Sequence, residues 1–139
     1  MKARIVGIAV AVLLVVVSLS WAHWRYGSLA NAAAYIDGRK VHADKLIREL
    51  GTVERDKLLK VEFNVINLQN EPLRIVGANA SCSCILPPDM PIALEPFTTT
   101  PVVFTFRSPE TTQPFEQNIN LYFDGPIPDM QLKIVGVTQ

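Results

Sequence analysis

The chain has 139 residues, which is enough for one domain and a short additional segment. Its 13 Lys and Arg residues balance its 13 Asp and Glu residues, and no Lys/Arg stretch is dense enough to bind phosphates. This argues against a nucleic-acid partner, because such binding depends on clustered positive charge. Ten prolines disfavour long helices in most of the chain.

The first apolar run, residues 5–22, is uncharged and follows Lys2 and Arg4. With His23 and Trp24 it reaches about 20 residues, the length of a membrane-spanning helix. Basic residues before such a run stay in the cytoplasm, which predicts that the rest of the chain lies on the far side. A buried helix of a cytosolic domain would have a polar face, and this run has none.

The same run is compatible with either a cleaved signal peptide or an uncleaved membrane anchor. Ser20-Trp21-Ala22 is a small-x-small sequence, so the run is compatible with a cleaved signal peptide and a secreted domain. The long apolar core, together with aromatic residues at its end (Trp21, Trp24 and Tyr26), favours an uncleaved anchor over residues 1–24. We therefore expect a single-pass membrane protein with an extracytoplasmic C-terminal domain.

From residue 35 onward the pattern is that of an all-β domain, and residues 25–34 are expected to be a linker. Residues 35–41 contain Asp-Gly, which favours a type I′ hairpin turn. Residues 46–53 predict a short strand or a helical turn that leads into a strand.

The clearest strand is residues 58–68, where Leu59, Val61, Phe63 and Val65 alternate with polar side chains. Comparable segments follow, separated by turn residues, at 73–80, 92–94, 102–106, 115–123 and 130–137. About seven strands in about 100 residues are typical of an immunoglobulin-like antiparallel β-sandwich, which we place at 35–139.

Several short motifs follow one another in a characteristic order. Gly51-Thr52-Val53 precedes a strand that ends in Asn67, and Glu71-Pro72-Leu73-Arg74-Ile75 begins the next strand. Asn79-Ala80-Ser81-Cys82-Ser83-Cys84 comes next, and the chain closes on Leu132-Lys133-Ile134-Val135-Gly136. Over residues 33–137 this order resembles the bacterial family catalogued as domain of unknown function 1573.

The resemblance implies an immunoglobulin-like fold, often exported, with no established enzymatic activity. The chain departs from the family pattern at two glycines. Ser83 stands between the cysteines, and Phe97 follows Pro96 before the next strand. These replacements put any tight turn that depends on glycine at either place in doubt.

Cys82 and Cys84 are the only cysteines, and four interpretations stay open. They could be free thiols packed as small apolar groups, a local disulfide, a two-thiolate metal site completed by another chain, or a redox-active pair. In an extended strand their Cα atoms would lie roughly 6.5–7 Å apart, at the limit for a disulfide. A bridge therefore needs a turn or bulge.

No catalytic constellation is evident. There is no G-x-S-x-G nucleophile motif, and the only histidines, His23 and His42, are too few to complete a four-ligand zinc site with the cysteines. We predict a non-catalytic binding or structural module without a cofactor or small-molecule substrate. Its expected partners are the membrane and another envelope protein. The alternative is a thiol-redox or metal-handling protein that uses Cys82 and Cys84.

Overall fold

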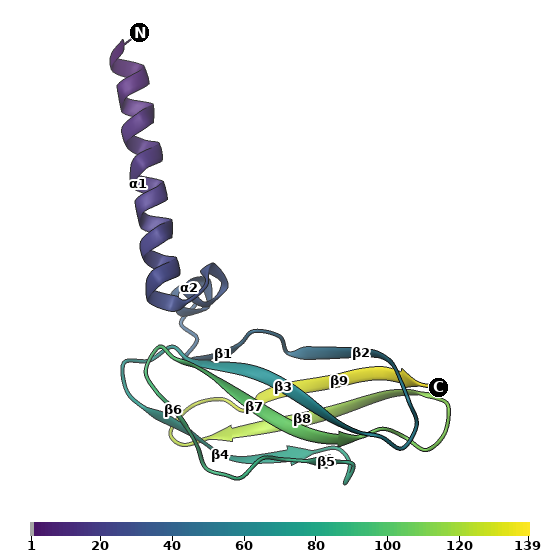
Figure 1. Ribbon diagram of the computed structural model, residues 1–139. Helices are drawn as coiled ribbons and strands as arrows, with labels where there is room; N and C mark the ends of the chain where they lie inside the picture. The colour runs from purple at the N-terminus through teal and green to yellow at the C-terminus, as the bar shows by residue number, and fades with distance from the viewer. Residues whose placement is uncertain (1) are drawn as a thin grey trace. The chain divides into compact units, whose positions relative to one another are not determined.

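The computed structural model describes residues 2–139. The chain divides into a helical unit that ends at Arg39 and a β unit, Lys40–Gln139, which are described separately (Figure 1).

The helical unit contains two helices, α1 (Lys2–Tyr26) and α2 (Leu29–Ile36). Ser28 caps α2, because its side chain accepts a hydrogen bond from the Asn31 backbone N–H over 3.1 Å. Three consecutive alanines within α2 favour the helix. The segment expected to be a linker is therefore helical from Leu29 onward.

The hairpin expected at residues 35–41 is wrong, and the reason lies in Asp37-Gly38. Gly38 has a φ of +77° and its N–H donates to the Tyr35 carbonyl, while the Arg39 N–H donates to the Ala34 carbonyl. This pair of bonds is a Schellman motif, which ends a helix. Asp-Gly is therefore a helix C-cap here, and the β unit begins at Lys40 rather than at residue 35.

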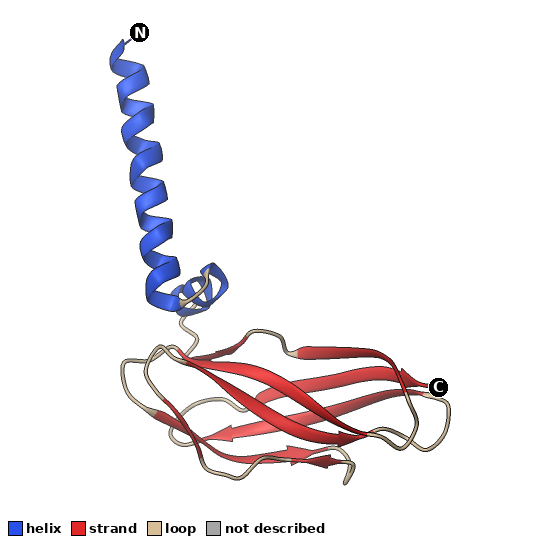
Figure 2. Cartoon of the chain, in the orientation of Figure 1, coloured by secondary structure: helices blue, strands red, loops and turns tan. Residues whose placement is uncertain are grey.

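The β unit contains nine strands in two sheets. The four-stranded sheet has the order β1 (Val41–Ala43), β3 (Leu58–Asn67), β7 (Thr99–Arg107) and β5 (Ile85–Leu86). The five-stranded sheet has the order β2 (Ile47–Val53), β9 (Met130–Thr138), β8 (Pro114–Phe123), β4 (Leu73–Ala80) and β6 (Ile92–Leu94). Figure 2 shows the strands of the two layers in red.

One continuous apolar core joins the two sheets. Alternation places Val61, Phe63 and Val65 of β3 inside, as predicted, with the Phe63 and Phe104 rings in an edge-to-face contact at 6.1 Å. The other sheet supplies fully buried side chains such as Ile119 and Ile134. The core is therefore the interior of a sandwich between two sheets.

The predicted strands are confirmed for β3, β4, β6, β7, β8 and β9 to within a few residues. Two details differ from the expected seven-stranded antiparallel sandwich. β1 and β5 have only three and two residues, too few to show alternation in a sequence. In addition, β2 pairs with β9 in parallel, because the two strands are far apart along the chain and no hairpin fixes their direction.

One edge of the sandwich is covered by a segment that changes sheets. Ile85 and Leu86 pair with β7, and Ile92 to Leu94 then pair with β4, with Pro87, Pro88 and a cis Met90–Pro91 bond between them. β6 pairs only with Leu73–Ile75, so the outer edge of β4 has no paired strand from Val76 onward. Similarly, β5 leaves the outer edge of β7 unpaired from Thr99 to Phe104.

Candidate functional site

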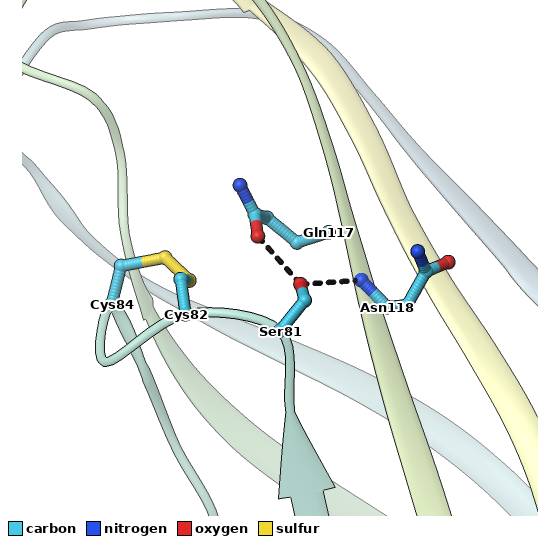
Figure 3. The surroundings of a disulfide bond; sticks show 5 residues. All are labelled: Ser81, Cys82, Cys84, Gln117 and Asn118. Carbon is cyan, nitrogen blue, oxygen red and sulfur yellow. Dashed lines mark hydrogen bonds between the residues drawn. A yellow bond between two sulfur atoms is a disulfide. The ribbon is translucent and has the colours of Figure 1, made fainter.

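The cysteine loop connects the two sheets at the end of β4. Cys82 and Cys84 are joined as a disulfide, with their Cα atoms 5.1 Å apart (Figure 3). A turn brings these Cα atoms closer than the extended chain would allow, because the Ile85 N–H reaches back to the Cys82 carbonyl over 3.5 Å. Of the four alternatives left open by the sequence, the structure contains the local disulfide.

Ser81 holds the start of this loop on β8. Its hydroxyl donates to Gln117 Oε1 over 2.7 Å and accepts from the Asn118 backbone N–H over 3.0 Å. The Ser81 N–H donates to the Asn118 carbonyl over 2.9 Å. The two cysteines are half-buried against the core. The loop is therefore a supported turn, fixed at its base by three hydrogen bonds.

The two lost glycines have different structural consequences. Ser83 is not among the described residues with positive φ, so the turn between the cysteines needs no glycine. Phe97 does adopt a positive φ of 53°, and its N–H donates to the Asn67 carbonyl over 2.8 Å. The tight turn after Pro96 is therefore kept, although the residue in it is not glycine.

The unpaired outer edge of β4, which we call the β4 edge, comprises Gly77, Ala78, Asn79 and Ala80. None of these side chains is charged and none is proline, the two commonest devices that block strand addition. Val76, the bulged residue just before them, is 47% exposed. The β4 edge also runs directly into the disulfide loop. The unpaired stretch of β7, by contrast, contains Pro101.

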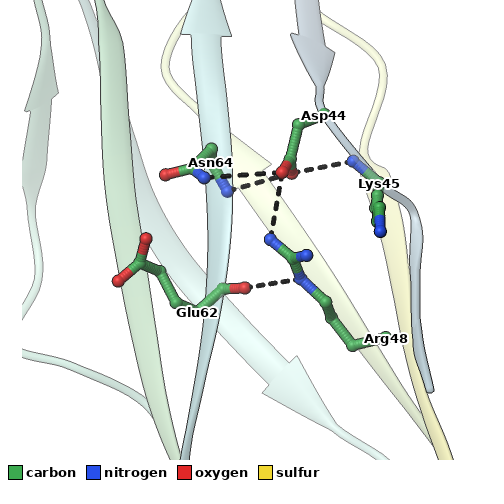
Figure 4. Close-up of polar contacts among 5 residues, drawn as sticks. All are labelled: Asp44, Lys45, Arg48, Glu62 and Asn64. Atoms are coloured by element: carbon green, nitrogen blue, oxygen red, sulfur yellow. Dashed lines mark hydrogen bonds and ion pairs between the residues drawn. The ribbon is translucent and has the colours of Figure 1, made fainter. Parts of the chain in front are cut away.

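The opposite side of the sandwich is closed by side chains (Figure 4). The Asp44 carboxylate accepts from the Asn64 N–H over 3.2 Å and pairs with Arg48 at 3.0 Å, and Arg48 Nε donates to the Glu62 carbonyl over 2.7 Å. β1 pairs with β3 only from Val65 onward, so these side chains take the place of a strand along Glu62–Asn64. We call Asp44, Arg48 and Asn64 the polar staple.

The polar staple sets the ionisation of Asp44. Partial burial raises the pKa of Asp44, but hydrogen bonds from the backbone N–H groups of Lys45 and Asn64 and the charge of Arg48 outweigh this effect. The pKa therefore lies below its ordinary value. The Arg48 guanidinium also lies 5.7 Å from the centre of the Phe63 ring, a cation–π distance. The staple is thus a structural closure of this edge.

A shallow surface hollow of about 290 Å³ lies at the end of the sandwich that contains the turn after β8. Lys40, Glu71 and Asp124 contribute its charged lining. Asp124 is already paired with Arg74 at 2.9 Å, and hydrogen bonds from the Arg74 backbone and side chain lower its pKa. The Asp124 carboxylate in this hollow is therefore already neutralised by Arg74, which lies outside the lining.

The remaining predicted residues lie apart from the disulfide loop. Trp21 and Trp24 are exposed on α1, whose stretch Val6–Tyr26 is long and apolar enough to cross a membrane. Lys2 and Arg4 lie outside the residues whose side chains the structure describes. His42 is half-buried in β1, and the described residues contain no group of three or more His, Cys, Asp or Glu placed to hold a metal ion.

Sequence reasoning missed the β4 edge and the polar staple. Both depend on which strands become neighbours, and the short strands β5 and β6 leave little signal. In the sequence, the only indication of an open strand edge is that residues 76–80 carry small or uncharged side chains.

Comparison with solved structures shows the same type of fold at low sequence identity. The PapD-like domain 7 of human CEP192 is 11% identical, with a TM-score of 0.58 over 72% of this chain and 85% of that chain. A protein of unknown function from Porphyromonas gingivalis W83 is 14% identical, with a TM-score of 0.57 over 70% of this chain and 46% of the other. The VesB protease of Vibrio cholerae is 12% identical, with a TM-score of 0.55 over 81% of this chain.

This chain spans only 36% of the VesB chain and less than half of the P. gingivalis protein, so these similarities concern the fold of one domain. A search of curated proteins found none that matches. Residues 41–138 match the family described as protein of unknown function (DUF1573). This match covers the whole β unit except its ends, and the chain belongs to that family.

Proposed function

We propose that the protein is a membrane-held, extracytoplasmic binding module whose immunoglobulin-like sandwich receives a strand of another envelope protein at the β4 edge. The observation that carries this proposal is the unpaired, uncharged stretch Gly77–Ala80. Backbone N–H and C=O groups along such an edge can form a new ladder with an extended segment. Small side chains on β4 leave room for the side chains of the incoming strand.

The other edges support this choice by being less suitable. The polar staple covers Glu62–Asn64 of β3, and the part of β3 before it carries the charged residue Lys60. Pro101 removes an N–H from the open part of β7. β2 carries the charged residues Arg48 and Glu49 and an irregularity in its pairing between Glu49 and Thr52. Gly77–Ala80 therefore has neither the charged side chains nor the proline that oppose strand addition on these other edges.

The placement outside the cytoplasm is supported by α1 and by the disulfide. Val6–Tyr26 has the length and composition of a membrane span. A disulfide such as Cys82–Cys84 persists in oxidising compartments and is rare in the cytosol. We propose no catalytic activity, cofactor, nucleic acid or small-molecule substrate for the module.

Photocrosslinking in the cells that make the protein tests the proposal. A photoreactive amino acid at Asn79 should give a covalent adduct with one defined protein. The matched control is Gln131, an exposed position on the interior strand β9. Introducing Asn79→Lys should abolish the adduct formed from a photoreactive residue at Val76, because a lysine on the edge opposes strand addition. Equal adducts from positions 79 and 131, or none from 79, would contradict the proposal.

A second candidate function is thiol–disulfide exchange, favoured by the presence of the Cys82–Cys84 bond in an accessible turn. The dithiol of another protein would attack one sulfur, and the S–S bond would break as a mixed disulfide forms. The second partner thiol would then resolve it. The partner would leave as a disulfide, and Cys82 and Cys84 would each gain a proton and together two electrons.

Incubating the full chain with a dithiol of defined potential and then trapping free thiols by alkylation tests this function. Exchange predicts two alkylated cysteines that equilibrate with the dithiol ratio, and no alkylation in the Cys82→Ser/Cys84→Ser variant. A bond that stays oxidised at every dithiol ratio under native conditions would show that it is only structural.

A further inference from the structure

The end of α1 and the whole of α2 carry an unusual set of exposed apolar side chains. Trp24 is 82% exposed and Ile36 is 83% exposed, and Leu29 and Tyr35 are also exposed. We call these four residues the collar. α2 has no charged side chain at all. If this helix were surrounded by water, its apolar side chains would be exposed to solvent, which is unfavourable.

α2 is attached firmly to the end of α1 (Figure 1). The Asn31 side chain donates to the Tyr26 carbonyl over 2.9 Å, which satisfies one of the unpaired carbonyls at the end of α1. Ala32 and Ala34 are buried, and the Tyr26 and Tyr35 rings lie 5.1 Å apart. The Trp21 ring meets the Tyr26 ring edge-on at 6.5 Å.

The length of the span determines the depth at which this attachment occurs. Val6–Tyr26 has 21 residues. At 1.5 Å per residue they cover about 31 Å, which matches a hydrocarbon core of about 30 Å. Tyr26 then falls at the boundary of the hydrocarbon, and α2 begins three residues later at Leu29. The collar therefore lies at the level where Trp and Tyr side chains are enriched in membrane proteins.

We propose that α2 is an interfacial helix, whose collar is embedded among the lipid headgroups and upper acyl chains on the side of the membrane that carries the β unit. This inference rests on the proposed insertion of α1. Lipid is the favoured occupant because the collar continues the apolar surface of the span and has polar boundaries. Arg25 stands at one boundary and Asp37 and Arg39 at the other, where charged groups meet the headgroups.

Intrinsic tryptophan fluorescence can test the depth of the collar, because Trp21 and Trp24 are the only tryptophans in the chain. The reporter is the full chain with Trp21→Phe, Trp24→Phe and Ile36→Trp, reconstituted in phosphatidylcholine/phosphatidylglycerol vesicles that contain brominated lipids. A second reporter replaces Leu29 instead of Ile36. The matched control replaces Leu58, a leucine of β3 that is 59% exposed, by Trp in the same background.

Interfacial burial predicts blue-shifted emission at positions 36 and 29, with stronger quenching by bromines near the headgroup than by bromines near the chain ends. The Leu58→Trp control should show water-exposed emission without quenching. Emission and quenching at positions 29 and 36 that equal those of the control would overturn the inference.

A chain that keeps only Trp21, through Trp24→Phe, separates this failure from failure of the anchor. Quenching of Trp21 together with unquenched Trp at position 36 would leave α1 inserted and refute the interfacial helix alone. Unquenched Trp21 would refute both insertion and the interfacial helix. Water-exposed, unquenched emission at position 36 in vesicles alone, which shifts to the blue only when a second protein is added, would assign the collar to a protein partner and would overturn the lipid assignment.

Discussion

The buried amide of Asn67 shows how one residue can hold together segments that are distant in sequence. Its Nδ2 group donates to the carbonyls of Leu94 and Glu71 at 2.9 and 2.8 Å, and its Oδ1 accepts from the Gln69 N–H at 2.9 Å. The side chain is fully buried. It therefore fixes the turn after β3 onto the end of β6, and this explains why the strand ends in an amide residue.

Asn67→Ala should destabilise the β unit by about 2–3 kcal/mol, because it leaves buried backbone groups without partners. Urea unfolding of the full chain in detergent, followed by the β-sheet circular dichroism signal, measures the change. Asn70→Ala, three residues further on and exposed, should have little effect. A loss for Asn67→Ala that is no larger than for Asn70→Ala would show that water satisfies these groups.

Gly136 is required by a close approach rather than by its φ angle. A Cβ atom at this position would lie 2.6 Å from Phe115 Cζ and 2.9 Å from the Gly51 carbonyl oxygen. Gly51 itself has a φ of +66° within the irregular part of β2. The two glycines noted in the sequence motifs therefore meet where β2 pairs with β9.

Gly136→Ala should destabilise the protein by about 1–3 kcal/mol through overpacking. Gly77→Ala is the matched control, because its Cβ would meet only Tyr122 at an ordinary 3.6 Å. Thermal unfolding of the single variants, and of Gly136→Ala combined with Phe115→Leu, measures both the cost and its source. Phe115→Leu should restore part of the stability that Gly136→Ala removes, because it makes room for the added methyl group. Equal losses of stability for Gly136→Ala and Gly77→Ala would contradict the packing argument.

At the scale of elements, the polar staple predicts how the joined ends of β1, β2 and β3 respond to acid. The pKa of Asp44 is lower in the folded chain than its ordinary value of 3.8. The carboxylate therefore contributes stability that is fully present above pH 3.8 and is lost as the pH falls through the folded pKa. Asp124, held by Arg74, acts in the same direction.

Asp44→Asn should lower the free energy of unfolding by roughly 0.5–1 kcal/mol at neutral pH, the range of an exposed pair. The difference from the natural chain should be smaller at a pH below 3.8, because the stabilisation by the natural carboxylate is lost as the pH falls through its lowered pKa. Urea midpoints at the two pH values measure this. Asp129→Asn, which removes an exposed carboxylate in the turn before β9, is the matched control. A constant gap between Asp44→Asn and the natural chain at both pH values would exclude ionisation as the cause.

The long strands could be predicted from the sequence because each has one buried face. In β3, β7 and β8 the apolar side chains recur at every second position, which fixes both the strand and the side that enters the core. β1 and β5 are set by pairing with longer neighbours and leave no periodic pattern. Asp37-Gly38 predicts a hairpin from the sequence because the same residues suit both a type I′ turn and a helix C-cap, and only the preceding helix distinguishes them.

The candidate site could be predicted only in part, for a related reason. The cysteine pair is visible in the sequence, but the turn that brings their Cα atoms to 5.1 Å depends on bonds from Ile85 and Ser81 to other segments. The β4 edge is defined by how far β6 extends along β4. Such a boundary is a property of the assembled sheet, and no local pattern encodes it.

At the scale of the whole molecule, we expect the helical unit to determine whether the sandwich stays at a membrane. α1 continues without interruption through Ser20-Trp21-Ala22, a small-x-small sequence compatible with signal-peptide cleavage. Its end is then tied to α2 by the Asn31 bond to the Tyr26 carbonyl. Cleavage after Ala22 would remove most of the helix on which α2 is built. We propose that the entire span is retained.

Retention predicts that the protein stays in the membrane fraction after alkaline extraction, and that its intact mass includes residues 1–22. The same spectrum should be lighter than the reduced chain by two hydrogens, because of the Cys82–Cys84 bond. Deleting residues 2–26 while supplying a cleavable signal sequence should release the sandwich in soluble form, which is the matched control. A native product that begins at His23 and is found in the soluble fraction would show instead that the segment is a signal peptide, and the edge of β4 would then meet its partner without a tether.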